Sequence, residues 1–184
     1  MERKEALKFI EAKLREGFSK QEIYKELSTK IYLKSDLLQY LAMVPDPEKR
    51  IKFRTINLIL FALLIFITIL KILTALVFFA RISAWLIPLS FIIPFVAIFL
   101  AVEVKKFRGY IYRPLGLLGI ASLFQSLSHI EDLGRMNPGQ LIFEFIVGYL
   151  TTILVIVIAF YISAKAFPYY GFLGLKKEKL NIKV

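Results

Sequence analysis

The chain lacks cysteine and contains one histidine among its 184 residues. The absence of cysteine excludes disulfides, thiolate catalysis and cysteine-based metal sites. A single histidine also excludes a zinc site built on two histidines. Acidic residues are scarce too, because 14 Asp and Glu stand against 25 Lys and Arg and leave a net charge of +11. We therefore expect no metal and no cofactor. The excess of basic residues is considered below together with the apolar stretches.

Apolar residues are abundant, since they make up 58% of the chain and include 17 Phe and 9 Tyr. A typical soluble domain is about 45–50% apolar. A bilayer core of about 30 Å requires ~20 helical residues, and four stretches poor in charge match that length within residues 47–167. These are 52–77, 83–103, 109–130 and 140–165. The pattern predicts an all-α integral membrane protein with a four-transmembrane-helix bundle.

The basic residues indicate the orientation of these spans. With four spans, only Arg81 and Arg135 fall clearly on one side of the membrane. The other side receives twelve basic residues: Arg50, Lys52, Arg54, Lys105, Lys106, Arg108, Arg113, Lys165, Lys176, Lys177, Lys179 and Lys183. Loops rich in Lys and Arg remain in the cytosol. The asymmetry predicts that both termini are cytoplasmic, and we expect the protein in a prokaryotic inner (plasma) membrane.

Residues 1–46 are hydrophilic overall and predict a small cytosolic helical module of about three short helices. Apolar residues recur at helical spacing in the first of these helices: Leu7, Ile10, Leu14 and Phe18. Glu11 and Arg15 on the same helix are expected to form an i,i+4 ion pair in the favourable order. A unit this small buries little core, so we expect it to need support from a partner or from the membrane surface.

Helix boundaries in this region follow from turn and capping residues. Gly17 is a plausible helix stop, and Ser19 with Glu22 has the spacing of a capping box that begins the second helix. Asp46 has the position of an N-cap, and the proline after it suits the first helical position. No glycine or proline interrupts the next thirty or so residues. The sequence therefore predicts one unbroken helix from Pro47 into the first span.

The stretch from Gly17 to Leu27 resembles the first helix of many helix-turn-helix domains. The resemblance ends there, because eight positions separate Leu27 from Ser35, whereas the turn of that motif needs about 3–4 residues. Tyr24 is also bulky at a position where such helices usually need a small residue. The charges are mixed and form no basic recognition face. We expect no binding of nucleic acid.

One segment resembles an enzyme motif. Lys106, followed after six residues by Arg113-Pro114, matches the first phosphate-binding motif of the type-2 phosphatidic acid phosphatase family. That family also needs two histidines, as nucleophile and as general acid, and this chain has one. No nucleophile elbow is present either. We therefore predict no catalytic residues and a non-enzymatic protein.

Polar residues within the spans are Lys71, Gln125, His129 and Glu144. In the four-span topology Lys71 and Glu144 both belong to the outer half of the bilayer, where a charge is costly unless it is paired or reaches the interface. One interpretation is a polar cavity in which these four side chains converge. The other is that Lys71 snorkels to the headgroups and Glu144 is interfacial.

The cytoplasmic loops predict contact with anionic lipid headgroups. The residues concerned are Lys105, Lys106, Arg108, Arg113, Lys176 and Lys177. Residues 168–184 are aromatic and basic, as expected of an interfacial cytoplasmic tail. Glycines within the spans, among them Gly116 and Gly119, permit close helix approach, so self-association into a homo-oligomer is a further option.

Two functions are compatible with this pattern. The first is a membrane scaffold or adaptor that receives a protein partner through residues 1–46. The alternative is a small oligomeric transporter or channel with a polar site in the outer half of the bilayer. They differ in whether the intramembrane polar side chains converge on one cavity.

Overall fold

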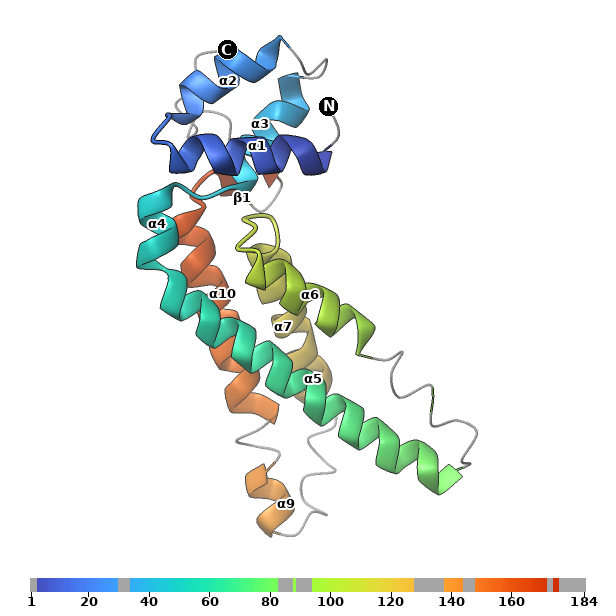
Figure 1. The fold of residues 1–184 in the computed structure, drawn as a ribbon. Coiled ribbons are helices and arrows are strands. Elements are labelled where there is room, and N and C mark those ends of the chain that lie inside the picture. The colour runs from blue at the N-terminus through green and yellow to red at the C-terminus, as the bar shows by residue number, and fades with distance from the viewer. Residues whose placement is uncertain are drawn as a thin grey trace.

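The computed structural model describes residues 3–29, 34–82, 88, 94–127, 138–143, 148–171 and 174–175. Apart from turns and loops, this part of the chain is helical, with one two-residue antiparallel ladder, so the predicted all-α class is confirmed. The helices are α1 Arg3–Arg15, α2 Lys20–Ser28, α3 Lys34–Met43, α4 Pro47–Lys52, α5 Arg54–Ile82, α6 Phe95–Lys105, α7 Tyr112–Leu127, α9 Pro138–Phe143 and α10 Thr151–Ala166 (Figure 1). The ladder pairs β1 (Tyr170–Gly171) with β2 (Gly174–Leu175).

The turn between α1 and α2 forms as the local sequence predicts. Gly17 has a φ of 93°, a left-handed conformation that costs glycine little because it has no Cβ. The N–H of Phe18 donates to the carbonyl oxygen of Lys13 at 3.1 Å, which closes a Schellman-type end of α1. Both bonds of the predicted capping box are present: Ser19 Oγ accepts from the Glu22 N–H, and the Glu22 carboxylate accepts from the Ser19 N–H.

Helices α1, α2 and α3 pack on one another to form the N-terminal module, residues 3–44. Its core is mostly aliphatic and comprises, besides Tyr24, Ala42 and Met43, the residues Leu7, Ile10, Leu14, Ile23, Leu27, Leu37, Leu38, Leu41 and Val44. One core residue comes from far along the chain, because Tyr169, which follows α10, is 8% exposed in this cluster. The module is therefore completed by the segment that follows the last helix.

The helix predicted to run unbroken from Pro47 is divided at Phe53, so that prediction was wrong. Phe53 has φ −100° and ψ 5°, and α4 turns away from the axis of α5 at this residue (Figure 1). The Phe53 ring is 5% exposed and meets Tyr161 of α10 edge-on at 5.9 Å. Phe53 N–H still bonds to Lys49 at 3.0 Å, and Asn57 N–H to Phe53 at 2.9 Å. The break thus bends the chain and packs an aromatic ring at the loss of little backbone hydrogen bonding.

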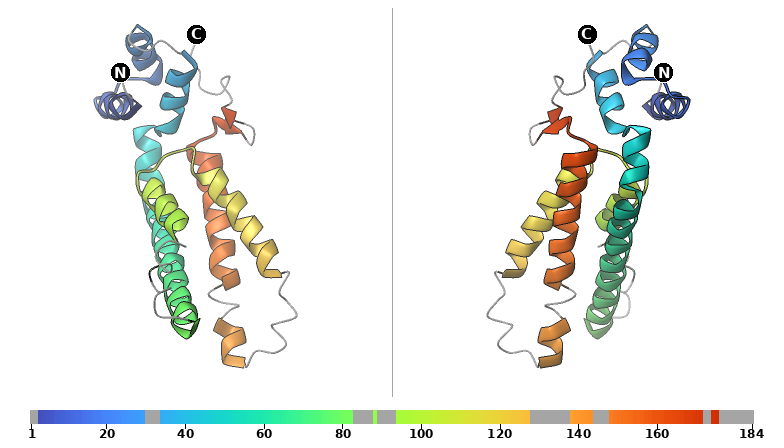
Figure 2. Two further views of the ribbon diagram at one scale, coloured as in Figure 1. Left: turned by 90° about the vertical axis from the view of Figure 1, so that its right-hand side faces the viewer. Right: turned by 90° about the vertical axis from the view of Figure 1, so that its left-hand side faces the viewer.

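Four longer helices extend away from the module. Helix α5 leaves it, α6 returns to it, α7 leaves and α10 returns (Figures 1 and 2). The contacts join α5 to α6 and to α10, and α10 to α7. Close approach of α7 and α10 depends on small residues, as predicted: a Cβ on Gly116 would lie 2.8 Å from the Phe160 ring, and one on Gly119 would lie 2.6 Å from Ile156. The two glycines therefore set the spacing of this helix pair.

Two of these helices are long and apolar enough to cross a membrane: Arg54–Val77 within α5, and Gly148–Ala166, which contains α10. Only 22% of the most apolar stretch of the first and 33% of that of the second is buried. The core helix of a soluble protein would be mostly buried. Large apolar side chains are instead exposed on all four long helices, for example Leu58 at 63%, Phe95 at 69% and Phe124 at 70%. An exposed apolar surface of this extent is typical of a region that contacts a membrane or a protein partner.

Candidate functional site

The module is attached to the long helices through a polar network centred on Asp46. Asp46 Oδ1 lies 3.3 Å from Lys20 Nζ, and Oδ2 lies 3.1 Å from Lys49 Nζ. The Tyr169 hydroxyl donates to Oδ2 at 3.0 Å and accepts from Lys49 at 3.2 Å. Lys20 also donates to the carbonyl oxygen of Val44 at 2.8 Å, and its ammonium lies 4.7 Å from the centre of the Tyr169 ring. The network joins α2, the α3–α4 linker, α4 and the segment after α10.

The network shifts the pKa values of its members. Burial acts to raise the pKa of Asp46, but the charges of Lys20 and Lys49 and the hydrogen bonds that it accepts hold the pKa below its ordinary value. Burial lowers the pKa of Lys20, and the charge of Asp46 offsets part of that effect. The folded protein thus favours an ionised Asp46 at neutral pH.

Acid should release the module. Since the folded state depresses the pKa of Asp46, its contribution to stability is complete above the ordinary pKa of 3.8 and is lost as the pH falls through the lowered value. We expect the thermal midpoint in detergent, followed by circular dichroism, to fall more steeply below about pH 4 in the wild type than in Asp46→Asn. The same acid dependence in both proteins would contradict this assignment.

A second attachment joins α1 and α3 to the loop between α6 and α7. Arg108 of that loop lies 3.0 Å from Glu11 of α1, and both side chains are mostly buried, at 14% and 22% exposed. The Gly109 N–H donates to the carbonyl oxygen of Met43 at 3.0 Å. The predicted pairing of Glu11 with Arg15 is wrong, because among the described residues Glu11 pairs with Arg108 instead. The partly buried Arg108 can replace Arg15 as the partner of Glu11, since a solvent-exposed i,i+4 pair contributes only about 0.3–0.5 kcal/mol.

An aromatic cluster supports the same loop. Phe107 has a φ of 56°, a left-handed conformation that is unusual for a residue with a side chain. Its ring is 3% exposed and lies 5.9 Å from Tyr112 and 5.5 Å from Phe167. Tyr112 and Phe167 stack on each other at 5.4 Å. The packing of these rings holds Phe107 in a conformation that would otherwise favour glycine.

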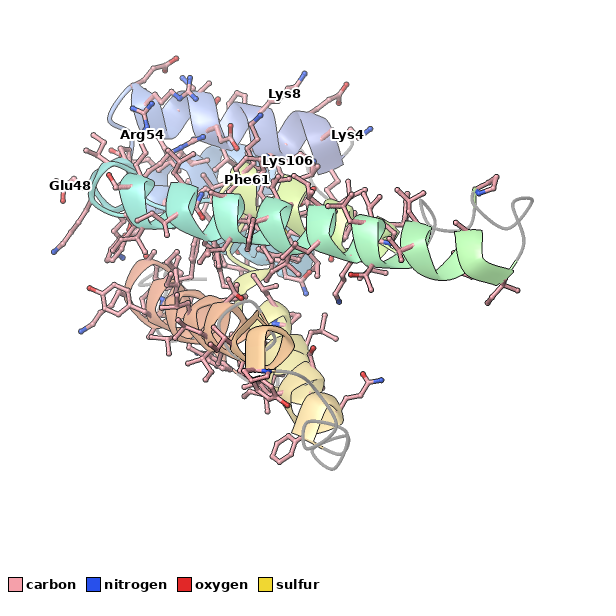
Figure 3. All side chains as sticks on the ribbon, turned by 90° about the horizontal axis from the view of Figure 1, so that it is seen from below. Lys4, Lys8, Glu48, Arg54, Phe61 and Lys106 are labelled. Carbon is pink, nitrogen blue, oxygen red and sulfur yellow. The ribbon has the colours of Figure 1, made fainter. Side chains whose placement is uncertain are left out.

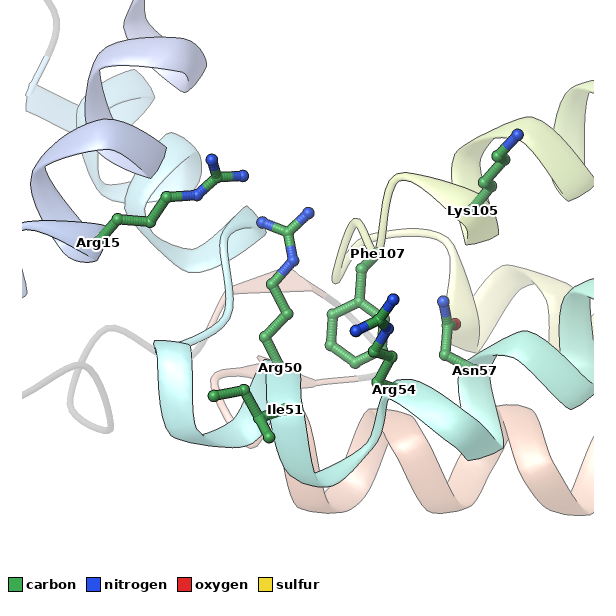
Figure 4. A pocket seen from close by; sticks show the side chains of 7 residues that line it. All are labelled: Arg15, Arg50, Ile51, Arg54, Asn57, Lys105 and Phe107. Atoms are coloured by element: carbon green, nitrogen blue, oxygen red, sulfur yellow. The ribbon is translucent and has the colours of Figure 1, made fainter.

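A pocket of about 360 Å³ opens where the module, the α4–α5 junction and the end of α6 meet (Figure 4). Its described lining includes four basic residues: Arg15, Arg50, Arg54 and Lys105. The remaining lining residues are Ile51, Asn57 and Phe107. No acidic residue is present in this described lining. We call this the basic pocket.

Buried, hydrogen-bonded residues form the base of the basic pocket. The Asn57 amide nitrogen donates to the carbonyl oxygen of Val104 at 2.9 Å, and its amide oxygen accepts from the Tyr112 hydroxyl at 2.6 Å. Asn57 is 8% exposed and Phe107 is 3% exposed. The base of the pocket is therefore buried and hydrogen-bonded, whereas the Arg15 and Arg54 side chains are exposed.

Comparison with protein families, curated proteins and solved structures finds no match to this chain. Its chemistry must therefore be judged from the site alone. Across the part of the chain that the structure describes, no group of three His, Asp or Glu residues could hold a metal ion. The positive charge of the basic pocket instead suits an anion.

The predicted intramembrane residues lie apart from this pocket. Lys71 is exposed on α5, and it forms no ion pair with any residue that the structure describes. Gln125 is exposed near the end of α7. His129 and Glu144 lie outside the described residues, so the pairing of Lys71 with Glu144 stays a prediction.

Six residues were predicted to contact anionic lipid through their positive charge. Lys105 lines the basic pocket, and its ammonium also lies 5.6 Å from the Phe61 ring. Lys106 is half-exposed and forms an ion pair with Glu103 at 2.6 Å.

Arg108 and Arg113, from the same predicted set, have protein partners. Arg108 binds Glu11, as described above. Arg113 Nε donates to Ser163 Oγ of α10 at 3.1 Å. Lys176 and Lys177 lie outside the described residues. Lys105 is thus the predicted lipid contact that the structure places in the pocket.

The three arginines of the basic pocket were missed as a site. Arg50 and Arg54 are one helical turn apart in sequence, and this spacing is a local signal that could have indicated a shared face. Arg15 had no such signal, because it reaches the pocket through the docking of α1. Figure 4 shows the Arg15 and Arg50 side chains pointing toward one another from different helices.

Proposed function

We propose that the chain is a four-span membrane protein with both termini in the cytosol, and that it acts as a non-enzymatic scaffold or adaptor. Its N-terminal module would receive a protein partner and hold it at the membrane surface. The attachment of the module to the helix ends is the observation that carries this proposal. Because the module is attached at the Asp46 network and at Arg108, a partner bound to the module would be held at a fixed place relative to the long helices.

Several features support four spans. Helices α6 and α7 run antiparallel to their neighbours and expose apolar side chains, as α5 and α10 do (Figures 1 and 2). Four described basic residues of the long helices lie at the end that carries the module (Arg54, Lys105, Arg113 and Lys165), whereas Lys71 and Arg81 lie farther along α5. Such an arrangement agrees with the positive-inside rule. The module would then lie in the cytosol.

The outer face of α1 supports the adaptor role. The apolar face of this helix is buried by Ala6, Leu7, Ile10 and Leu14. Lys4 and Lys8 are exposed, and Figure 3 shows Lys8 extending from the side of α1 opposite to α5. That face is accessible from the cytosol in the proposed topology and presents positive charge to a partner.

The topology can be tested directly because the chain contains no cysteine. Single cysteines introduced as Lys8→Cys and Lys106→Cys should resist a membrane-impermeant maleimide in intact cells and react after permeabilisation. Arg135→Cys should react in intact cells. Labelling of Lys8→Cys from outside would contradict the proposed orientation.

The adaptor role requires a separate test. A photo-crosslinking residue at Lys4, Lys8 or Lys25 should yield one discrete protein adduct in native membranes. The matched control is Leu58, which is 63% exposed on the apolar face of α5 and should yield lipid adducts. If all four positions yield lipid adducts alone, the scaffold proposal fails.

A further inference from the structure

The basic pocket carries four basic side chains, and its described lining contains no carboxylate. Two carboxylates near the pocket are already engaged in ion pairs: Glu11 with Arg108, and Asp46 with Lys20 and Lys49. Glu11 also lines a small cavity adjacent to the pocket, where its carboxylate is held by Arg108 at 3.0 Å.

The arginines of the pocket stand apart from this pattern. Arg15, Arg50 and Arg54 form no ion pair with any carboxylate among the described residues. Arg15 and Arg50 nevertheless point toward one another (Figure 4). Two guanidinium groups that face each other repel unless an anion lies between them.

The type of cation indicates the type of anion. A guanidinium group presents paired N–H donors that match the oxygens of a phosphate, and it keeps its charge at any physiological pH. Three such groups from α1, α4 and α5 surround one cavity. Its volume of about 360 Å³ is within the range of small-ligand pockets and exceeds what a bare phosphate ion needs.

We infer that the basic pocket binds a phosphate-bearing anion through Arg15, Arg50 and Arg54, so that the ligand joins the module to the membrane helices. Two sources could supply this chemistry. The pocket lies where the apolar stretch of α5 begins, at Arg54, and Ile51 beside it is 78% exposed. In the proposed topology this is the depth of lipid phosphates, so an anionic lipid headgroup can enter from the side. A soluble phosphate ester can enter from the cytosol.

The inference does not depend on the scaffold role, and only its lipid source depends on the proposed topology. The test uses the full chain and a triple variant, Arg15→Gln, Arg50→Gln and Arg54→Gln. The matched control removes three charges at exposed positions outside the pocket, through Lys8→Gln, Lys52→Gln and Lys165→Gln. Because the pocket arginines form no ion pair with the described residues and repel one another, the triple variant should melt no lower than the wild type without ligand.

The first arm measures binding of inorganic phosphate and of glycerol 3-phosphate to the protein in neutral detergent by calorimetry. The second arm measures retention of phosphatidic acid by native mass spectrometry, after reconstitution in phosphatidylcholine nanodiscs with and without that lipid. We expect one arm to show binding that falls about a hundredfold or more in the triple variant, because several charge-assisted hydrogen bonds are lost. The control should retain wild-type binding.

The two arms separate the sources. Selective loss in the first arm assigns a soluble phosphate ester, and selective loss in the second assigns a lipid headgroup. Arg50→Lys keeps the charge but not the paired donors, so it should weaken binding about tenfold. If the wild type binds none of these probes, or if the triple variant and the control weaken binding equally, the inference is overturned.

Discussion

Asp46→Ala should detach the N-terminal module at a cost of about 3 kcal/mol. The reason is Lys20, whose side chain is 9% exposed and which would keep a buried charge without its carboxylate partner. Asp46 itself is 35% exposed, so solvent screening places the cost at the lower end of the range for buried pairs. Lys20 would retain only the Val44 carbonyl oxygen and the Tyr169 ring as partners.

A double-mutant cycle distinguishes this cause from general damage. Lys20→Met added to Asp46→Ala removes the orphaned charge, and we expect the double variant to be more stable than the sum of the single effects predicts. Lys13→Met is the matched control, because Lys13 pairs with Glu16, which is 55% exposed, and it should cost less than about 1 kcal/mol. The measurement is thermal unfolding in detergent, with hydrogen exchange of α1–α3 reporting on the module. Additive single effects would show that Lys20 and Asp46 are not coupled.

Local features of the fold were predictable from the sequence because short-range chemistry determines them. Gly17 is the residue best able to adopt the left-handed turn that ends α1, and Ser19 with Glu22 satisfies the first N–H groups of α2. The small residues Gly116 and Gly119 likewise indicated close packing of helices. Each of these predictions needs only a few neighbouring residues.

Long-range partners were not predictable in the same way. The sequence predicts that Tyr169 belongs to an interfacial tail, yet the structure packs it among the helices of the module. Glu11 has a favourable local partner in Arg15, yet it binds Arg108, which comes from a loop far along the chain. The break at Phe53 contains no glycine or proline, and it coincides with packing of the Phe53 ring against Tyr161. These outcomes depend on tertiary contacts that one sequence does not reveal.

The basic pocket depends both on a local signal in the sequence and on a long-range contact. Arg50 and Arg54 were recognised as basic residues at the start of a span, but only as determinants of orientation. Arg15 was assigned to a surface ion pair. Because Arg108 takes the carboxylate of Glu11, Arg15 becomes available to the pocket. Because Glu11 pairs with Arg108 and not with Arg15, the Arg15 side chain becomes part of a candidate binding site.

Gly109→Ala should destabilise the attachment of the module by about 1–3 kcal/mol or more through overpacking. A Cβ at this position would lie 2.8 Å from Cγ of Phe167, which is too close for any real contact. Phe167 is 0% exposed and is held between Phe107 and Tyr112, so its ring has no free space into which to move. Movement of the backbone would instead stretch the bond from the Gly109 N–H to Met43, which is part of the second attachment.

The control for this prediction is a change of size at the partner. Phe167→Leu alone leaves a cavity and should also destabilise, whereas Gly109→Ala combined with Phe167→Leu places the new methyl group in part of the vacated space. The double variant should therefore be more stable than the sum of the two single effects predicts. Thermal unfolding in detergent gives the free energies, and hydrogen exchange at α3 reports whether the bond to Met43 survives. If the destabilisations of Gly109→Ala and Phe167→Leu simply add, contact with the Phe167 ring is not the reason for glycine at position 109.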